Sequence, residues 1–247
     1  MSPAPIPGSS RAHPALSAES IVACARSLLH DEGAMAITIN GVGRALGVSG
    51  PALYRHVDSL SALLDLLVAT LYAEVTEQMV SGARDLPADQ RLFSLARTLR
   101  HWALANQREF QFLFNSPTTT GWGDPASPPQ LEGQRFGAVF LEAFADAVQG
   151  SQVPLLDAEI SPGDREQLIL FAQRSEQQLS PQEVAFFLEM WIEVYGHITM
   201  EALGQMSYAL SDMSGLFESR LARLQRVLNG GGPTGVPDRH EAPSRVP

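Results

Sequence analysis

The helical spacing of apolar residues constrains this chain more than any other feature. Hydrophobic side chains recur every three or four residues over almost all of 17–229, which is the period of an α-helix with one buried face. No run of alternating β-branched residues is long enough to predict a strand. Hydrophobic residues make up 45% of the 247 residues, enough for a sizeable core. The pattern therefore predicts an all-α protein of about nine helices.

Capping and stop residues set the predicted helix boundaries. Ser17, Thr38 and Ser49 are suited to cap helix N-termini, while Gly33 and Gly47 are suited to end helices. The first four helices are expected at 17–33, 38–46, 49–57 and from Asp58 or Ser59 to about residue 80. The next helix is expected at 88–106, followed directly by a short one that ends near 114 and by a long loop at 115–129. The remaining helices are expected at 131–148, 164–178, 180–206 and 211–229.

Composition limits where the chain resides and what it contains. The tails 1–16 and 230–247 are rich in Pro, Gly, Ala and Ser and are expected to be disordered. The N-terminus lacks the apolar segment of a signal peptide, and acidic residues interrupt the most apolar run, 60–75. We therefore expect a cytoplasmic protein without a membrane partner. The single cysteine, Cys24, excludes an internal disulfide and is expected to be a small buried residue.

Charge is distributed unevenly along the chain. The net charge is -10, and the chain has 17 arginines and no lysine. Residues 1–60 hold four arginines and four acids, whereas residues 61–247 hold 13 arginines and 23 acids. Because a negative field repels DNA, only the first sixty residues are candidates for contact with nucleic acid.

The segment 44–57, "RALGVSGPALYRHV", predicts a tight turn between two short helices. Gly47 ends one helix and Ser49 begins the next, a spacing typical of a helix-turn-helix. Leu53 and Val57 are four residues apart and should face the core, which leaves Tyr54 and Arg55 outside. An ordinary helical corner of an all-α domain would show the same pattern.

The segment from Ser17 to about Tyr72 resembles the DNA-binding domain of the tetracycline-repressor (TetR/AcrR) family. The resemblance is carried by a Thr opening the second helix, then Leu-Gly-Val-Ser, Leu-Tyr-x-His-Val and Leu-Leu. It implies a three-helix DNA-binding domain at 17–62, a linking fourth helix at 59–80, and a bundle at 63–229 for ligand binding and dimerisation.

The resemblance assigns DNA contacts by position. Asn40 and the start of the third helix would face base edges, and the others would face the backbone. A purely structural hydrogen bond is the alternative for His56. The candidates are Thr38, Asn40, Arg44, Ser49, Gly50, Pro51, Ala52, Tyr54, Arg55 and His56.

Three positions depart from the family pattern. Leu60 stands where a basic, phosphate-binding residue is usual, which predicts modest, salt-tolerant DNA binding. Gly41 and Gly43 lie inside the second helix, where each glycine costs about 0.5–1 kcal/mol relative to alanine. Close packing explains Gly43 more simply than a helix that becomes ordered only on DNA.

The predicted helix at 180–206 is similar to the eighth helix of one C-terminal subgroup of the family, through Trp191, Tyr195, Gly196 and Glu201. A glycine inside a helix lets another backbone approach, here that of a second subunit. The apolar stripe of the last helix would complete a four-helix homodimer interface, with an intramolecular bundle as the alternative. The predicted interface residues are Trp191, Gly196, Met200, Leu216, Phe217, Leu221 and Leu224.

Aromatic residues of the C-terminal bundle suggest a site for a small, mainly apolar effector. For any one of them, ordinary core packing is the alternative interpretation. The predicted ligand-binding residues are Trp102, Phe110, Phe114, Phe140, Phe144, Phe171, Trp191 and Tyr195.

Together these patterns predict a homodimeric, ligand-responsive transcriptional regulator, with repression as the expected sign and a palindromic double-stranded DNA operator as the partner. The alternative is a helical protein of the same fold that binds small molecules or other proteins and no longer binds DNA tightly. No nucleophile motif, phosphate-binding loop or metal-ligand spacing is evident, so no enzyme activity, cofactor or metal is expected.

Overall fold

The computed structural model describes residues 16–115, 125–148, 160–174 and 177–229. These residues form ten α-helices and one 3₁₀ turn, η1, and no strand occurs among them. The helices are α1 (Ala18–Glu32), α2 (Ile39–Leu46), α3 (Gly50–Leu53), α4 (Leu60–Ala83), α5 (Ala88–Ala105), α6 (Gln107–Asn115), α7 (Pro128–Val148), α8 (Pro162–Arg174), α9 (Pro181–Ala202) and α10 (Ser214–Leu228), and η1 is Ala34–Ala36. The all-α prediction is confirmed, and each of the ten helices corresponds to one of the expected ranges.

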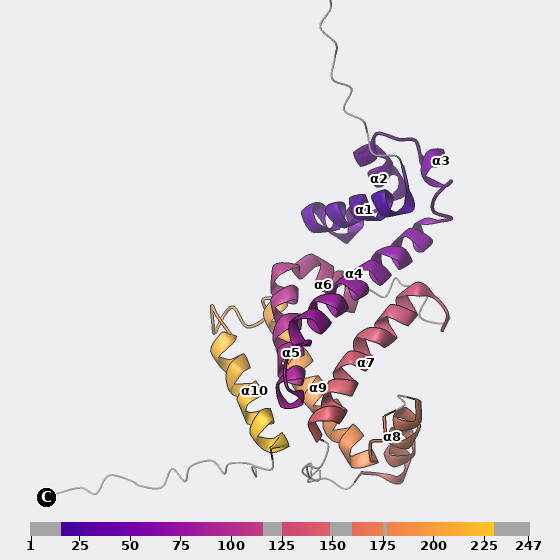
Figure 1. Ribbon diagram of the computed structural model, residues 1–247. Helices are drawn as coiled ribbons and strands as arrows, with labels where there is room; N and C mark the ends of the chain where they lie inside the picture. The colour runs from indigo at the N-terminus through magenta and orange to yellow at the C-terminus, as the bar shows by residue number, and fades with distance from the viewer. Residues whose placement is uncertain (1–15, 116–124, 149–159, 175–176, 230–247) are drawn as a thin grey trace, which may run out of the picture.

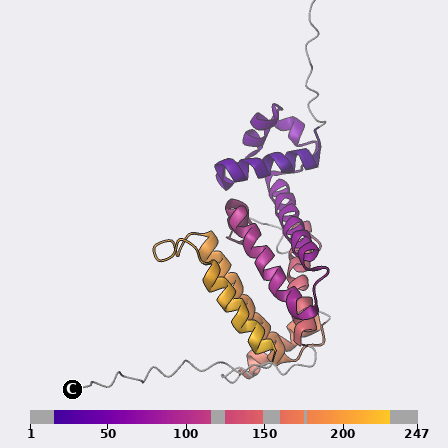
Figure 2. The ribbon, with the colours of Figure 1, turned by 60° about the vertical axis from the view of Figure 1, so that its left-hand side comes forward.

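The molecule has two parts joined by one long helix. Helices α1 to α3 form the N-terminal domain at one end, and α4 runs from it into a helical body made of α4 to α10 (Figure 1). Helix α4 packs chiefly against α5 and α7. Helix α10 lies along the outside of the body, beside α9 and α5, and α8 lies at the end far from the N-terminal domain (Figures 1 and 2).

Two of the three predicted caps form, whereas Ser49 stands at the N-cap of α3 without a capping hydrogen bond from its side chain. Ser17 and Ser20 make a reciprocal capping box at α1, and the Thr38 hydroxyl accepts the Gly41 N–H at 2.9 Å. Ser59, rather than Asp58, caps α4 by accepting the Ala62 N–H at 3.0 Å. Since each cap satisfies a backbone donor that the helix leaves unpaired, these residues define the helix starts locally.

Several predicted boundaries need correction. Helix α7 begins at Pro128 rather than 131, α9 ends at Ala202 rather than 206, and α10 begins at Ser214 rather than 211. Helix α3 ends at Leu53, and residues 54–56 continue as a turn in which the His56 N–H bonds the Leu53 carbonyl. Helix α4 extends three residues past the predicted end, to Ala83. Helix α8 begins at Pro162 rather than 164. The predictions for 1–15, 116–124, 149–159, 175–176 and 230–247 lie outside the described residues.

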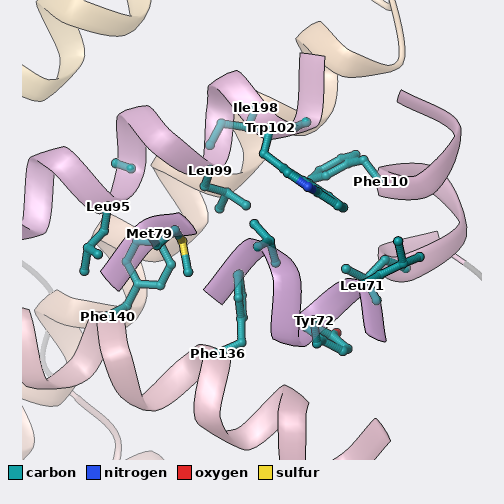
Figure 3. Close-up of a cluster of buried hydrophobic side chains, with 14 of the residues drawn as sticks. Leu71, Tyr72, Met79, Leu95, Leu99, Trp102, Phe110, Phe136, Phe140 and Ile198 are labelled. Carbon is teal, nitrogen blue, oxygen red and sulfur yellow. The ribbon is translucent and has the colours of Figure 1, made fainter. Parts of the chain in front are cut away.

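One contiguous hydrophobic core connects the two parts of the molecule. Buried side chains from α1 to α7, α9 and α10 belong to a single cluster. Its centre is shown in Figure 3, where Trp102 and Phe110 from α5 and α6 share the cluster with Tyr72 of α4 and Phe136 of α7. This continuity lets the body determine how the N-terminal domain is held.

Candidate functional site

The turn between α2 and α3 is built on two glycines. Gly47 adopts a left-handed conformation, with φ 70°, and ends α2, and the Val48 N–H returns to the Gly43 carbonyl at 2.9 Å. A Cβ at Gly43 would lie 2.9 Å from the Val48 carbonyl oxygen. The close-packing interpretation of Gly43 is therefore supported, although the nearest partner is the turn rather than α3.

The residues assigned to DNA are accessible at the surface of the N-terminal domain. Eight of the ten are exposed, and Gly50 and Ala52 are partly exposed. Leu53 and Val57 are buried, with 0% and 3% of their surface accessible, and the Tyr54 side chain is 51% exposed. The inward and outward faces of this segment therefore follow the predicted spacing.

Among the described residues, two arginines of the N-terminal domain remain available for contact with DNA. Arg44 and Arg55 are exposed, whereas the guanidinium of Arg26 points back to the body and pairs with Glu74 of α4. Leu60, the position without the usual charge, is partly buried and packs against the core. Neither the pairing of Arg26 nor the packing of Leu60 could be predicted from the sequence, because each depends on how α4 packs against the N-terminal domain.

A cluster of seven aromatic rings, which we call the aromatic cluster, fills the centre of the body. Helix α6 contributes Phe110 and Phe114, whose ring centroids are 4.9 Å apart. Helix α9 contributes Trp191 and Tyr195, stacked at 5.4 Å with 13° between their planes. The cluster is completed by Tyr72 of α4 and by Phe136 and Phe140 of α7.

Tyr72 and Phe136 were missed from the sequence. Tyr72 extends the buried stripe of α4 four residues beyond Val68, a spacing that could have identified it. Burial, with a smaller contribution from Tyr195, raises the pKa of the Tyr72 phenol. The hydroxyl is protonated at neutral pH and, with the Tyr195 hydroxyl and the Trp191 indole N–H, provides a polar group in a mainly apolar cluster.

Three predicted ligand residues lie outside the aromatic cluster. Phe144 packs against Phe186 and Phe187, and Phe171 is exposed on α8. The Trp102 indole N–H donates to Glu74 at 2.9 Å. Helical spacing alone could not separate these positions, because several faces of the body helices are buried.

The body is tightly packed beside the cluster. A cavity lined by Phe140, Met190, Trp191 and neighbouring apolar side chains has a volume of about 10 Å³, close to the minimum for one water molecule. A drug-sized ligand needs several hundred cubic ångströms, so it would have to displace side chains there.

The predicted dimer surface divides into an exposed and a buried part. Met200 and Leu216 are 38% and 54% exposed, and the neighbouring Ile192 is 68% exposed. A Cβ added at Gly196 would meet no atom within 4 Å. This combination leaves an apolar strip on the outside of α9 and α10, which we call the α9–α10 face.

The other three residues of the last helix point inward. Phe217, Leu221 and Leu224 are 1%, 1% and 6% exposed within the single subunit, so they cannot bury further area in a dimer. They hold α10 against its own subunit, and their assignment to the dimer interface is corrected.

Within the described residues no helix is long and apolar enough to cross a bilayer. The same part of the chain holds no group of three or more His, Cys, Asp or Glu side chains placed to bind a metal ion.

Known proteins resemble this chain over most of its length. A family model described as "Tetracyclin repressor-like, C-terminal domain" matches residues 92–224. The HTH-type transcriptional regulator Rv1816 of Mycobacterium tuberculosis strain H37Rv is 28% identical over 224 residues, covering 84% of this chain and 90% of that protein.

Solved structures share the fold. The protein SCO4313 superposes with a TM-score of 0.65 at 23% identity, over 84% of this chain and 94% of that one. A TetR family transcription regulator from Marinobacter aquaeolei VT8 superposes with a TM-score of 0.53 at 13% identity, over 85% and 94% of the two chains.

Proposed function

Because this chain belongs to the tetracycline-repressor-like family of DNA-binding transcriptional regulators, we propose that it represses transcription from a palindromic operator as a homodimer. A small, mainly apolar effector releases it. The observation that carries this proposal is an exposed helix-turn-helix face joined by α4 to a body with a central aromatic cluster.

DNA recognition would use the short helix α3. Its first turn presents Gly50, Pro51 and Ala52 at the surface, where their small size allows close approach to base edges in the major groove. Tyr54 and Arg55 follow on the exposed side and suit contacts with the sugar–phosphate backbone. Arg44 adds a second cation to the same surface.

Dimerisation would use the α9–α10 face. The exposed Ile192, Met200 and Leu216 supply apolar area, and Gly196 leaves room for a partner helix. A two-fold axis through this face would present two α3 helices, which must lie about 34–36 Å apart to enter successive major grooves.

Effector release would begin at the aromatic cluster. Helix α6 carries Phe110 and Phe114 into the cluster, while Glu109 on the same helix contacts His30 of the N-terminal domain at 3.0 Å. An effector that inserts among the rings therefore displaces a helix that touches the N-terminal domain. The loss of operator affinity equals the effector's preference for the displaced state over the DNA-bound state.

A selection of genomic fragments with the purified full chain tests the DNA proposal. We expect enrichment of a short palindrome, and we expect Tyr54→Ala to weaken its binding while leaving the dimer intact. Absence of any sequence preference would contradict the proposal and favour the alternative, an effector-binding helical protein without tight DNA contact. Leu60 motivated that alternative, and its packing against the core gives this residue a structural role instead.

The dimer is tested separately by light scattering. Ile192→Asp places a charge on the α9–α10 face and should convert the dimer to a monomer, because a desolvated unpaired charge is strongly unfavourable. Leu131→Asp is the matched control, since Leu131 is 52% exposed on α7, outside this face. Equal dimerisation of both variants would place the interface elsewhere.

A further inference from the structure

Helix α1 is held to the body by an ion pair that crosses between the two parts of the molecule. The Arg26 guanidinium of α1 donates through both terminal nitrogens to the Glu74 carboxylate of α4. The bond from Nη2 to Oε1 measures 3.0 Å. Such bidentate pairing restrains orientation as well as distance, because both groups are planar.

The same carboxylate is held from the other side by the body. The Trp102 indole N–H donates to Oε1 of Glu74 at 2.9 Å, so this oxygen accepts from both the N-terminal domain and α5. Trp102 is 1% exposed and belongs to the buried core (Figure 3). Its ring position is therefore determined by packing in the body rather than by solvent.

The carboxylate of Glu74 is stabilised in its charged form. Burial acts to raise the pKa of Glu74, but the hydrogen bonds from Arg26 and Trp102 outweigh burial and lower it. The Arg26–Glu74 ion pair between α1 and α4, which we call the Glu74 clamp, is consequently ionised at neutral pH. Arg26 and Trp102 then determine how the charged Glu74 carboxylate is oriented.

A second set of contacts links α1 to α6. His30 Nδ1 lies 3.0 Å from Oε1 of Glu109, and Arg108 donates to the His30 carbonyl at 2.6 Å. Glu109 is 1% exposed, and its second oxygen has no hydrogen-bond partner among the described residues. A buried carboxylate with one unpaired oxygen is costly. The paired oxygen of Glu109 also lies 4.0 Å from Arg26 Nε, so Arg26 faces both carboxylates, with its bidentate hydrogen bonds directed to Glu74.

We propose that Trp102 is a positioning residue for the N-terminal domain: its indole N–H orients Glu74, and Glu74 holds Arg26 and with it the angle of α1 on the body. This inference rests on the proposed function for its purpose, since the angle of α1 determines where α3 lies relative to DNA. A shift of α5 in the body would move the indole N–H and loosen α1 through Glu74.

The test is a double-mutant cycle between Arg26→Met and Trp102→Phe. Both side chains donate to the same Glu74 oxygen and form no hydrogen bond with each other, so Glu74 is their shared partner and coupling between them reports on it. Arg26 Nε also lies 4.0 Å from Oε1 of Glu109, so the same cycle in a Glu109→Gln background must give the same coupling. The measured quantity is amide hydrogen exchange of residues 18–32 in the full chain without DNA. Each single variant should speed this exchange about tenfold, the level set by a hydrogen bond to a charged group.

The combined variant gives the decisive result. With Arg26 already replaced, Trp102→Phe should add nothing to the exchange of residues 18–32, although its cost to global unfolding persists. If Trp102→Phe speeds α1 exchange equally with and without Arg26, the indole acts through packing alone and the proposal is overturned.

Two further variants keep the result interpretable. Glu74→Gln preserves size and, should Trp102→Phe not fold, must itself speed α1 exchange or the clamp is refuted. Arg97→Gln breaks the exposed pair with Glu218 of α10, far from α1 along the chain, and must leave α1 exchange unchanged.

Operator binding separates this inference from the proposed function. If the wild-type chain selects an operator, Trp102→Phe should change its affinity in the wild-type background and not in the Arg26→Met background. If no operator is selected, the proposed function fails while the exchange cycle still decides whether the clamp exists.

Discussion

The absence of a side chain at Gly43 allows the close backbone approach that forms the α2–α3 turn. Its ideal Cβ position lies 2.9 Å from the Val48 carbonyl oxygen, an atom that cannot move without shifting the turn. At Gly41 the corresponding distance to the Ala36 carbonyl oxygen is 2.5 Å. These glycines weaken the helix locally but let α2 pack directly on backbone, which side-chain size would otherwise prevent.

We expect Gly43→Ala to destabilise the protein by about 1–3 kcal/mol, because overpacking outweighs the usual gain of helix propensity. Gly137→Ala is the control: it lies in α7, and an added Cβ would meet no atom within 4 Å. That variant should gain about 0.5–1 kcal/mol. Urea unfolding measures both, and equal stabilisation of the two variants would argue against the tight turn.

At the scale of elements, α10 is fastened to α5 and α9 by a polar cluster. Arg100 of α5 donates to Glu201 of α9 at 2.7 and 2.5 Å and to the Ser214 hydroxyl at 2.8 Å. The centroid of the Phe217 ring is 5.2 Å from the Arg100 guanidinium carbon and 5.2 Å from the centroid of the His197 imidazole. These contacts position the start of α10 and therefore the exposed Leu216 of the α9–α10 face.

His197 makes this cluster sensitive to acid. Burial lowers the pKa of His197 below its ordinary value of 6.5, against the opposing effect of Glu201 and together with repulsion from Arg100. The unfolded chain therefore binds a proton that the folded protein rejects, and stability falls as the pH drops below about 6.5.

We expect the free energy of unfolding to decrease between pH 7 and pH 5, and His197→Phe to remove the part of this decrease that His197 causes. The exposed His56 provides the control variant, His56→Gln, which should keep the wild-type pH dependence. Denaturant midpoints at four or five pH values measure the effect. A His197→Phe profile parallel to wild type would assign the acid sensitivity to other groups.

At the scale of the whole molecule, charge separates the DNA-binding end from the body. Residues 61–247 carry ten more acids than arginines, whereas residues 1–60 are balanced. One of the four N-terminal arginines, Arg26, is committed to Glu74. Among the described residues of this domain, the exposed arginines are Arg44 and Arg55. The proposed operator binding must therefore rely largely on uncharged contacts.

We therefore expect a shallow salt dependence of operator binding. A dimer that places Arg44 and Arg55 of both subunits on phosphates should show a slope of log affinity against log salt of about -4, at -0.9 per phosphate. Titration of operator affinity with salt measures this slope, and replacing Arg55 with Gln should flatten it by about two units. A slope near -8 would show that other cations carry the binding.

The sequence alone determined the helical class, the capped starts of α1 and α2, the α2–α3 turn, and the inward and outward faces around Leu53 and Tyr54. These features depend on residues within one or two helical turns of each other, so local spacing is sufficient to predict them.

Tertiary structure decided everything that depends on residues distant in sequence. It turned Arg26 toward Glu74, placed Leu60 against the core and buried Phe217 within its own subunit. It also brought Tyr72 into the aromatic cluster and left Phe171 outside, because packing between helices, rather than spacing along one of them, selects which apolar face meets which.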